Sequence, residues 1–177
     1  DHLVWTIDNG GWDRGLLIRG GVYTIWAGEN ITTTAIPVIN TWEHIAVTYS
    51  STDVKFYVNG ILIYSKGSGE LSGPGVSVTI GGSSGKYWDG EIDEFRVWNV
   101  EKTASEITSN MNTSLSGSET GLVAYYNFES GSGSTLLDLA GSNNGSISGA
   151  TWVSGFGASG IACSTNLDTV SVTINLT

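Results

Sequence analysis

Three carboxylates lie within four consecutive residues of the sequence, at Glu91, Asp93 and Glu94. Paired carboxylates can act as acid and nucleophile in the hydrolysis of glycosidic bonds. Retaining hydrolysis needs the two groups about 5–5.5 Å apart. This segment is therefore the first candidate to weigh for catalysis.

No other residues form a catalytic set in the sequence. The two histidines are His2 and His44, and the strand-like alternation around His44 favours a structural role for it. The single cysteine, Cys163, has no histidine near it in the sequence and is interpreted as an unreactive thiol. One cysteine also excludes an internal disulfide and a cysteine-rich zinc site.

Two loops combine an aromatic ring with polar groups, as sugar recognition requires. The first contains Trp12, Asp13 and Arg14, and the second contains Tyr87. A flat ring can cover the apolar face of a sugar while carboxylate and guanidinium groups bind its hydroxyls. We interpret these four residues as the candidate ligand-binding residues, with burial in the core as the alternative for either ring.

Length and charge limit the classes of function. The chain has 177 residues, enough for one domain with a sizeable core. Seventeen acidic and seven basic residues give a formal charge of −10, which disfavours nucleic acid and anionic membrane surfaces as partners. No apolar run approaches the roughly 20 residues of a membrane helix, so membrane insertion is not expected.

The elements that must position these residues are strands. Short runs of alternating apolar and polar residues, separated by Gly, Asn, Ser and Asp, predict an all-β fold. The clearest unit is a hairpin at residues 54–64, because Asn59-Gly60 suits a type I′ turn. We expect the core-facing side chains to be those of Val54, Phe56 and Val58, with Ile61 and Ile63 able to join them.

Further strands are predicted at residues 15–19, 22–26, 45–49, 76–80, 91–98 and 122–128. The alternation breaks near Asp93, because Ile92 and Phe95 are both apolar and three residues apart. A β-bulge there would turn Asp93 or Glu94 out of the strand ladder.

One short helix is predicted after Val100. Thr103 and Glu106 have the spacing of a capping box, and Ile107 and Met111 form an apolar stripe. Residues 154–165 are small and linker-like, and the alternation at residues 170–174 predicts a last strand.

Four segments in order resemble the laminin-G-like family: residues 42–49 (WEHIAVTY), 54–60 (VKFYVNG), 89–99 (DGEIDEFRVWN) and 121–128 (GLVAYYNF). This family belongs to the concanavalin A-like lectin/glucanase superfamily. The resemblance implies a jelly-roll sandwich of two antiparallel sheets with one short helix. We expect this domain at residues 1–153, with a linker and terminal strand at residues 154–177.

The sequence departs from the family at its start. Family members usually open with a strand of the type Ala-Leu-x-Phe-Asp-Gly, which does not precede Asp1. We therefore interpret the chain as a piece of a longer protein. Residues 166–177 or a neighbouring chain are expected to fill the strand edge that this leaves.

The resemblance also bears on catalysis. Glucanases of this superfamily carry Glu-x-Asp-x-Glu or Glu-x-Asp-x-x-Glu on one strand. Glu91 and Asp93 match the first two positions, but the position of the acid is taken by Phe95 or Arg96, and neither can donate a proton at neutral pH. We therefore predict no enzymatic activity. Arg96 is expected to pair with Glu94 or another exposed acid at the surface.

Related jelly rolls often hold Ca²⁺, so the resemblance implies a possible calcium site. Calcium takes about six to eight oxygen ligands. The candidate metal ligands are Asp93, Asp138, Asn143 and Asn144. The alternative for Asp138 is that it caps its own loop by accepting backbone N–H groups.

We interpret the chain as a non-catalytic extracellular or cell-surface binding module of a larger protein. It would act in adhesion or carbohydrate recognition, with a glycan or a surface protein as partner and further domains of the same polypeptide as neighbours. One alternative is a structural or protein-binding module of a filamentous adhesin. A second is a glycoside hydrolase of the β-glucanase type with a degenerate catalytic strand.

Overall fold

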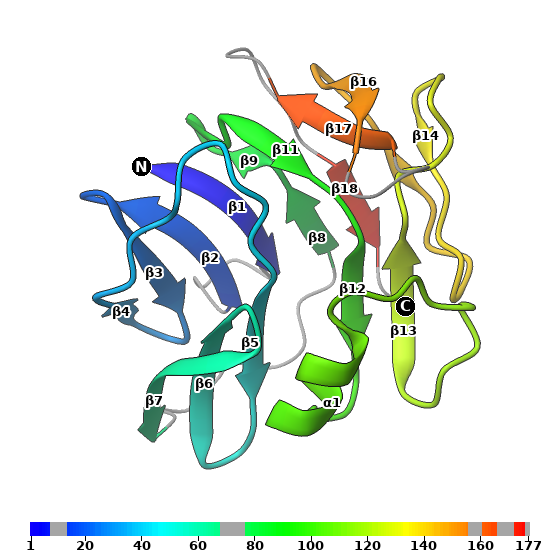
Figure 1. Ribbon diagram of the computed structural model, residues 1–177. Helices are drawn as coiled ribbons and strands as arrows, with labels where there is room; N and C mark the ends of the chain where they lie inside the picture. Colours follow the sequence, from blue (N-terminus) through cyan, green and yellow to red (C-terminus); the bar gives the residue numbers. More distant parts are fainter. Residues whose placement is uncertain (8–13, 68–76, 156–160, 166–171, 176–177) are drawn as a thin grey trace.

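The computed structural model describes residues 1–7, 14–67, 77–155, 161–165 and 172–175 (Figure 1). In these residues the structure consists of antiparallel strands with one short helix, as the sequence predicts. No helix among them is long and apolar enough to cross a membrane.

The largest sheet has eight strands. Their order is β14 (Thr135–Leu136), β15 (Gly145–Ser146), β18 (Val172–Asn175), β8 (Ser77–Ile80), β1 (His2–Ile7), β2 (Arg14–Arg19), β3 (Val22–Trp26) and β4 (Asn30–Thr32).

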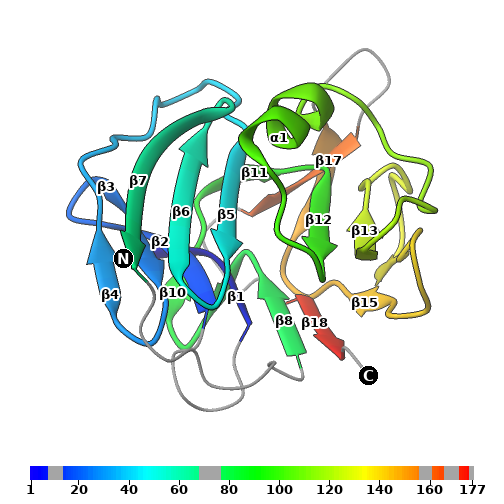
Figure 2. The same ribbon diagram turned by 90° about the horizontal axis from the view of Figure 1, so that it is seen from below.

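Smaller sheets make up the second layer; in Figure 2 the three-stranded sheet nearest the viewer lies in front of β1 and β2. Their strands are β5 (Ile45–Tyr49), β6 (Asp53–Val58) and β7 (Ile61–Gly67), then β12 (Phe95–Trp98) with β13 (Leu122–Tyr126), then β11 (Gly90–Ile92), β17 (Ile161–Thr165) and β16 (Thr151–Ser154). A two-stranded hairpin pairs β9 (Gly82–Ser83) with β10 (Lys86–Tyr87).

The core lies between the two layers in two main clusters. One joins β2 and β3 to β6 through Leu16, Ile25 and Phe56. The other joins β8 to β13 through Val78 and Tyr126. Both clusters consist of alternate residues of their strands, so the period-two pattern does select the inward face.

The hairpin at residues 54–64 is confirmed. Asn59 and Gly60 have φ of 50° and 77°, as a type I′ turn requires, and join β6 to β7. The expectation that Ile61 and Ile63 could face the core is wrong, because both are exposed. β7 is the edge strand of its sheet, and the core beneath is closed by Val54 and Phe56 of β6.

The predicted helix is α1 (Ala104–Asn110), and its capping box forms as expected. The Thr103 side chain accepts the backbone N–H of Glu106, whose carboxylate accepts the N–H of Thr103. Ile107 is the buried residue of the helix. The helix lies beside the β6–β7 turn, where Gly60 approaches Thr108.

Within the segment expected to be a linker, the described residues 161–165 are a strand. Residues 161–165 form β17, which pairs with β16 on one side and β11 on the other. These small residues have little intrinsic pattern, and pairing with two neighbours makes them a strand. The terminal strand, β18, lies between β8 and β15. The described C-terminal strands, β17 and β18, are therefore part of these sheets.

Candidate functional site

The three carboxylates lie where one predicted strand breaks in two. β11 ends at Ile92 and β12 begins at Phe95, and the two belong to different sheets. Glu94 has φ of 53°, in the left-handed region that non-glycine residues rarely adopt. This turn lets both Ile92 and Phe95 pack against the core. The expectation of a β-bulge within one strand is wrong, because the chain leaves one sheet at Ile92 and enters another at Phe95.

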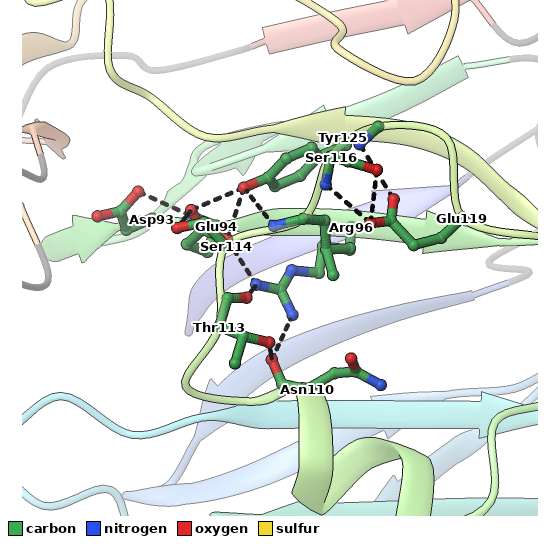
Figure 3. A network of polar contacts seen from close by, with 11 residues as sticks. Asp93, Glu94, Arg96, Asn110, Thr113, Ser114, Ser116, Glu119 and Tyr125 are labelled. Carbon is green, nitrogen blue, oxygen red and sulfur yellow. Dashed lines mark hydrogen bonds and ion pairs between the residues drawn. The ribbon is translucent and has the colours of Figure 1, made fainter.

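Glu94 is the anchor of a polar network behind this turn (Figure 3). Its carboxylate accepts hydrogen bonds from the Arg96 guanidinium and from the Tyr125 hydroxyl, the latter at 2.9 Å. The pair is confirmed, but it is largely covered, with 10% of the Arg96 side chain and 21% of the Glu94 side chain exposed. Burial, and then the hydrogen bond to Glu94, raise the pKa of Tyr125 to about 12.

The same network holds the segment that follows α1. Arg96 donates to the carbonyl oxygens of Asn110, at 2.8 Å, and Thr113. The Tyr125 hydroxyl accepts the backbone N–H of Leu115 at 3.2 Å. The Glu94 carboxylate and the Tyr125 hydroxyl are thus both engaged in structural hydrogen bonds.

The other two carboxylates, those of Glu91 and Asp93, are not followed by a carboxyl group at position 95 or 96. Glu91 is exposed, and Asp93 accepts the backbone N–H of Glu94 at 2.8 Å. Phe95 packs edge-on against Trp5, with ring centroids 6.4 Å apart. Positions 95 and 96, where the glucanase-like pattern places the acid, therefore hold no carboxyl group.

The candidate sugar-binding residues lie in separate places. Trp12 and Asp13 fall outside the described residues. Arg14 lies over the Tyr49 ring, 5.6 Å from its centroid, and pairs with Ile7 at the end of β1.

Tyr87 is half-buried at the other end of β1, where its carbonyl oxygen lies 3.1 Å from His2 Nδ1. His2 and Ile7 are five residues apart on one strand, roughly 16 Å. The structure therefore does not bring Tyr87 and Arg14 into one site.

The candidate calcium ligands Asp138, Asn143 and Asn144 form one loop network. One carboxylate oxygen of buried Asp138 accepts the N–H groups of Tyr125 and Ala140, each at 3.0 Å. The other accepts the Asn143 backbone N–H at 3.1 Å, and Asn144 Oδ1 accepts the N–H of Asp138.

These donors do not fit a cation. A carboxylate surrounded by N–H groups has its lone pairs occupied, whereas Ca²⁺ needs converging oxygens. Asp93 contacts the turn at Glu94, and no described residue belongs to a group of three or more His, Cys, Asp or Glu side chains able to hold a metal. The geometry supports the loop-capping alternative for Asp138, and the calcium site stays a prediction.

A large hollow between the layers is the feature that the sequence analysis missed. It has a volume of about 1920 Å³ and is walled by β5 on one side and by β11 and β12 on the other. Val4, Trp5 and Leu16 form part of its floor. The loop at residues 36–43 lies at its rim and exposes Ile36 (70%), Val38 (56%) and Ile39 (83%). The uninterrupted apolar run at residues 36–39 was the one feature of the sequence that could have indicated an exposed apolar surface here.

A family model decides the classification. The laminin-G-like model described as the concanavalin A-like lectin/glucanases superfamily matches residues 3–108. The chain belongs to this superfamily. The matched part of this concanavalin A-like domain includes β5, β11, β12 and most of α1.

The fold has a solved counterpart. A crystal structure of a candidate carbohydrate binding protein from Bacteroides ovatus ATCC 8483 is similar, with a TM-score of 0.64 and 20% sequence identity. The similarity covers 97% of this chain and 49% of that chain, so the domain spans about half of its structural neighbour. Comparison with curated protein sequences gave no match.

Proposed function

We propose that the chain is a non-catalytic carbohydrate-binding module that acts in adhesion at the cell surface or outside the cell, as part of a larger protein. The superfamily contains lectins and glucanases. The carboxylates at residues 91–94 are the feature by which we distinguish a lectin from a glucanase. The observation that carries the proposal is the turn at Glu94, which commits that carboxylate to Arg96 and Tyr125. The strand then has no acid for glycoside cleavage.

The name of the structural neighbour supports sugar as the ligand. On this chain, the hairpin that carries Tyr87 and Trp88 offers aromatic rings next to Asp89 and Lys86. Both rings are half-buried, so part of each is open to a ligand. Arg14, at the far end of β1, belongs to the second candidate group, whose other members, Trp12 and Asp13, lie outside the described residues.

A glycan array tests the proposal, run with Ca²⁺ and again with chelator. We expect binding to one glycan class, lost in Tyr87→Ala or Trp12→Ala and retained in the matched controls Tyr87→Phe and Trp12→Phe, because stacking needs a ring. Incubation with β-glucans should release no reducing ends. Silence on the array in both conditions would contradict sugar binding, and reducing ends would contradict the non-catalytic assignment.

A further inference from the structure

The basic side chains of the protein already have interaction partners. All seven Lys and Arg residues belong to the described part of the structure. Arg14 lies over the Tyr49 ring, and Lys86 also has an interaction partner. The other five form ion pairs with carboxylates: Arg19 with Asp1, Lys55 with Glu101, Lys66 with Glu29, Arg96 with Glu94 and Lys102 with Glu106. Among the described residues, therefore, no Lys or Arg is left without a partner to receive an anionic ligand.

Two acidic side chains beside the Tyr87 hairpin are different. Asp89 and Glu91 are exposed, and neither carboxylate forms an ion pair or a hydrogen bond with a described residue. Lys86 is the one Lys or Arg in the sequence between residues 82 and 92. Two carboxylates thus stand against one ammonium group in this segment, so its net charge is negative.

The Trp88 ring is held in place next to these two carboxylates. Its Nε1 donates to the backbone carbonyl oxygen of Glu91 at 3.3 Å. The ring also lies close to Gly90, where an added Cβ would be 2.8 Å from the same nitrogen. Salt screens charges over about 10 Å at 0.1 M, so a ligand that stacks on this ring experiences the charges of Asp89 and Glu91.

These unpaired carboxylates affect neutral and anionic sugars in opposite ways. A carboxylate is a strong acceptor for the hydroxyl groups of a neutral sugar. A carboxylate or sulfate group on the sugar itself would instead be repelled, since like charges a few ångströms apart repel each other even in water. The aromatic rings stack equally well on both kinds of sugar, so the charge decides between them.

We propose that the sugar surface at the Tyr87 hairpin binds uncharged glycans and discriminates against anionic ones, such as uronates and sulfated sugars. The inference rests on the carbohydrate-binding function proposed above and names its class of ligand. Tyr87 and Trp88 supply the stacking surface, and Asp89 and Glu91 supply the selection against negative charge.

Oligosaccharides that differ only in charge test the proposal. The probes are gluco-, manno-, galacto- and chito-oligosaccharides, each beside the same chain oxidised at C6 to the uronate. Chelator is present, because Ca²⁺ could otherwise bridge two carboxylates, and the pH is about 8, where histidine is ordinarily neutral.

Calorimetry on the whole chain measures both members of each pair. We expect the neutral member of the pair that binds to have an affinity at least about tenfold higher than its uronate. This ratio should shrink in about 1 M salt, because salt screens the repulsion and leaves the shape of the sugar unchanged. Tyr87→Ala should abolish binding of the neutral member.

Variants that change charge but hardly change shape test the role of the two acids. The double variant Asp89→Asn with Glu91→Gln should lower the ratio of affinities to below about threefold. Glu101→Gln is the control, because it removes one exposed charge between β12 and α1 while Lys55 keeps Asp53 as a partner. It should leave the ratio as it is.

The outcomes separate this inference from the function on which it rests. Equal or tighter binding of a uronate would overturn the inference and leave carbohydrate binding intact, as would a ratio that is unchanged by salt or by the double variant. Binding of a neutral chain that survives in Tyr87→Ala would overturn its placement at this hairpin. If none of the neutral or oxidised oligosaccharides binds, both the inference and the proposed function are wrong.

Discussion

Glu94 folds back onto Arg96, two residues further along the chain, and the turn that makes this possible has φ of 53° at Glu94. The relationship explains why a strand that carries Glu91, Asp93 and Glu94 is structural at its end. The third carboxylate accepts hydrogen bonds from Arg96 and Tyr125. The largely covered ion pair with Arg96 offsets the backbone strain at Glu94.

The Glu94–Arg96 ion pair should contribute more to the free energy of unfolding than an exposed ion pair does. Glu94→Gln removes the negative charge to which Arg96 and Tyr125 both donate hydrogen bonds. We expect it to lower the free energy of unfolding by about 1–3 kcal/mol. Glu101→Gln is the control, because Glu101 pairs with Lys55 at 2.9 Å among exposed side chains. Its cost should be at most about 0.5 kcal/mol. Urea unfolding measures both, and equal losses would show that the network is not specially stabilising.

The turn at Asn59-Gly60 offers a second comparison. A Cβ at Gly60 would lie 2.7 Å from Thr108 Oγ1 of α1, whereas one at Gly85 would meet nothing within 4 Å. Both glycines have positive φ, at 77° and 78°.

Gly85→Ala should therefore cost only the backbone strain of about 1–2 kcal/mol. Gly60→Ala should cost more, because the Thr108 side chain of α1 must also move away from the turn. Urea midpoints of the two variants measure the difference. Equal midpoints would mean that the contact between the turn and α1 is easily relieved.

Local signals in the sequence predicted the local structure well. Asn59-Gly60 fixes its turn through positive φ, and Thr103 with Glu106 fixes the helix start through two reciprocal hydrogen bonds. Ile61 and residues 161–165 were misjudged for a common reason. Which face of β7 is covered, and whether a small-residue segment becomes β17, depend on strands far away in the sequence.

The candidate site shows the same division. The break at Asp93 was visible in the spacing of Ile92 and Phe95, and the Arg96–Glu94 pair followed from proximity. The hollow was not predictable, because it arises from the separation of β5 and β12, which are some fifty residues apart. Its one local trace was the apolar loop at Ile36, Val38 and Ile39.

His44 should make the protein less stable in mild acid. Burial, and then the charge of Arg96, lower the pKa of His44 to about 4 in the folded protein, against about 6.5 when unfolded. Between these values the unfolded chain binds the proton more tightly, so stability is complete above about pH 6.5 and falls as the pH drops toward 4.

The loss should reach at most about 3 kcal/mol. Urea unfolding at pH 7 and pH 4.5 should show a smaller difference for His44→Gln than for the unchanged chain. His2→Gln, at an exposed position on β1, should leave the difference as it is. A pH dependence that persists in full in His44→Gln would assign it to another group.

Asp138 should stabilise its loop through backbone N–H groups and without calcium. Burial alone would raise the pKa of Asp138, but the N–H donors of Tyr125, Asn143, Ala140 and Gly141 outweigh it and hold the pKa below the usual 3.8. The stabilisation is therefore present above the unfolded pKa of about 3.9 and is lost as the pH falls through the folded value. Asp138→Asn should cost about 1–3 kcal/mol at pH 7, since one acceptor oxygen becomes a donor.

Thermal unfolding distinguishes the loop cap from the calcium site. For a cap, excess Ca²⁺ and chelator should give melting temperatures within about 1 °C of each other, because nothing binds the folded state selectively. The penalty of Asp138→Asn should then be equal in both conditions and should shrink in acid, where the unchanged Asp138 is itself protonated. A rise in melting temperature with Ca²⁺ that disappears in Asp138→Asn would instead restore the calcium site, since only a ligand held by this carboxylate could produce both effects.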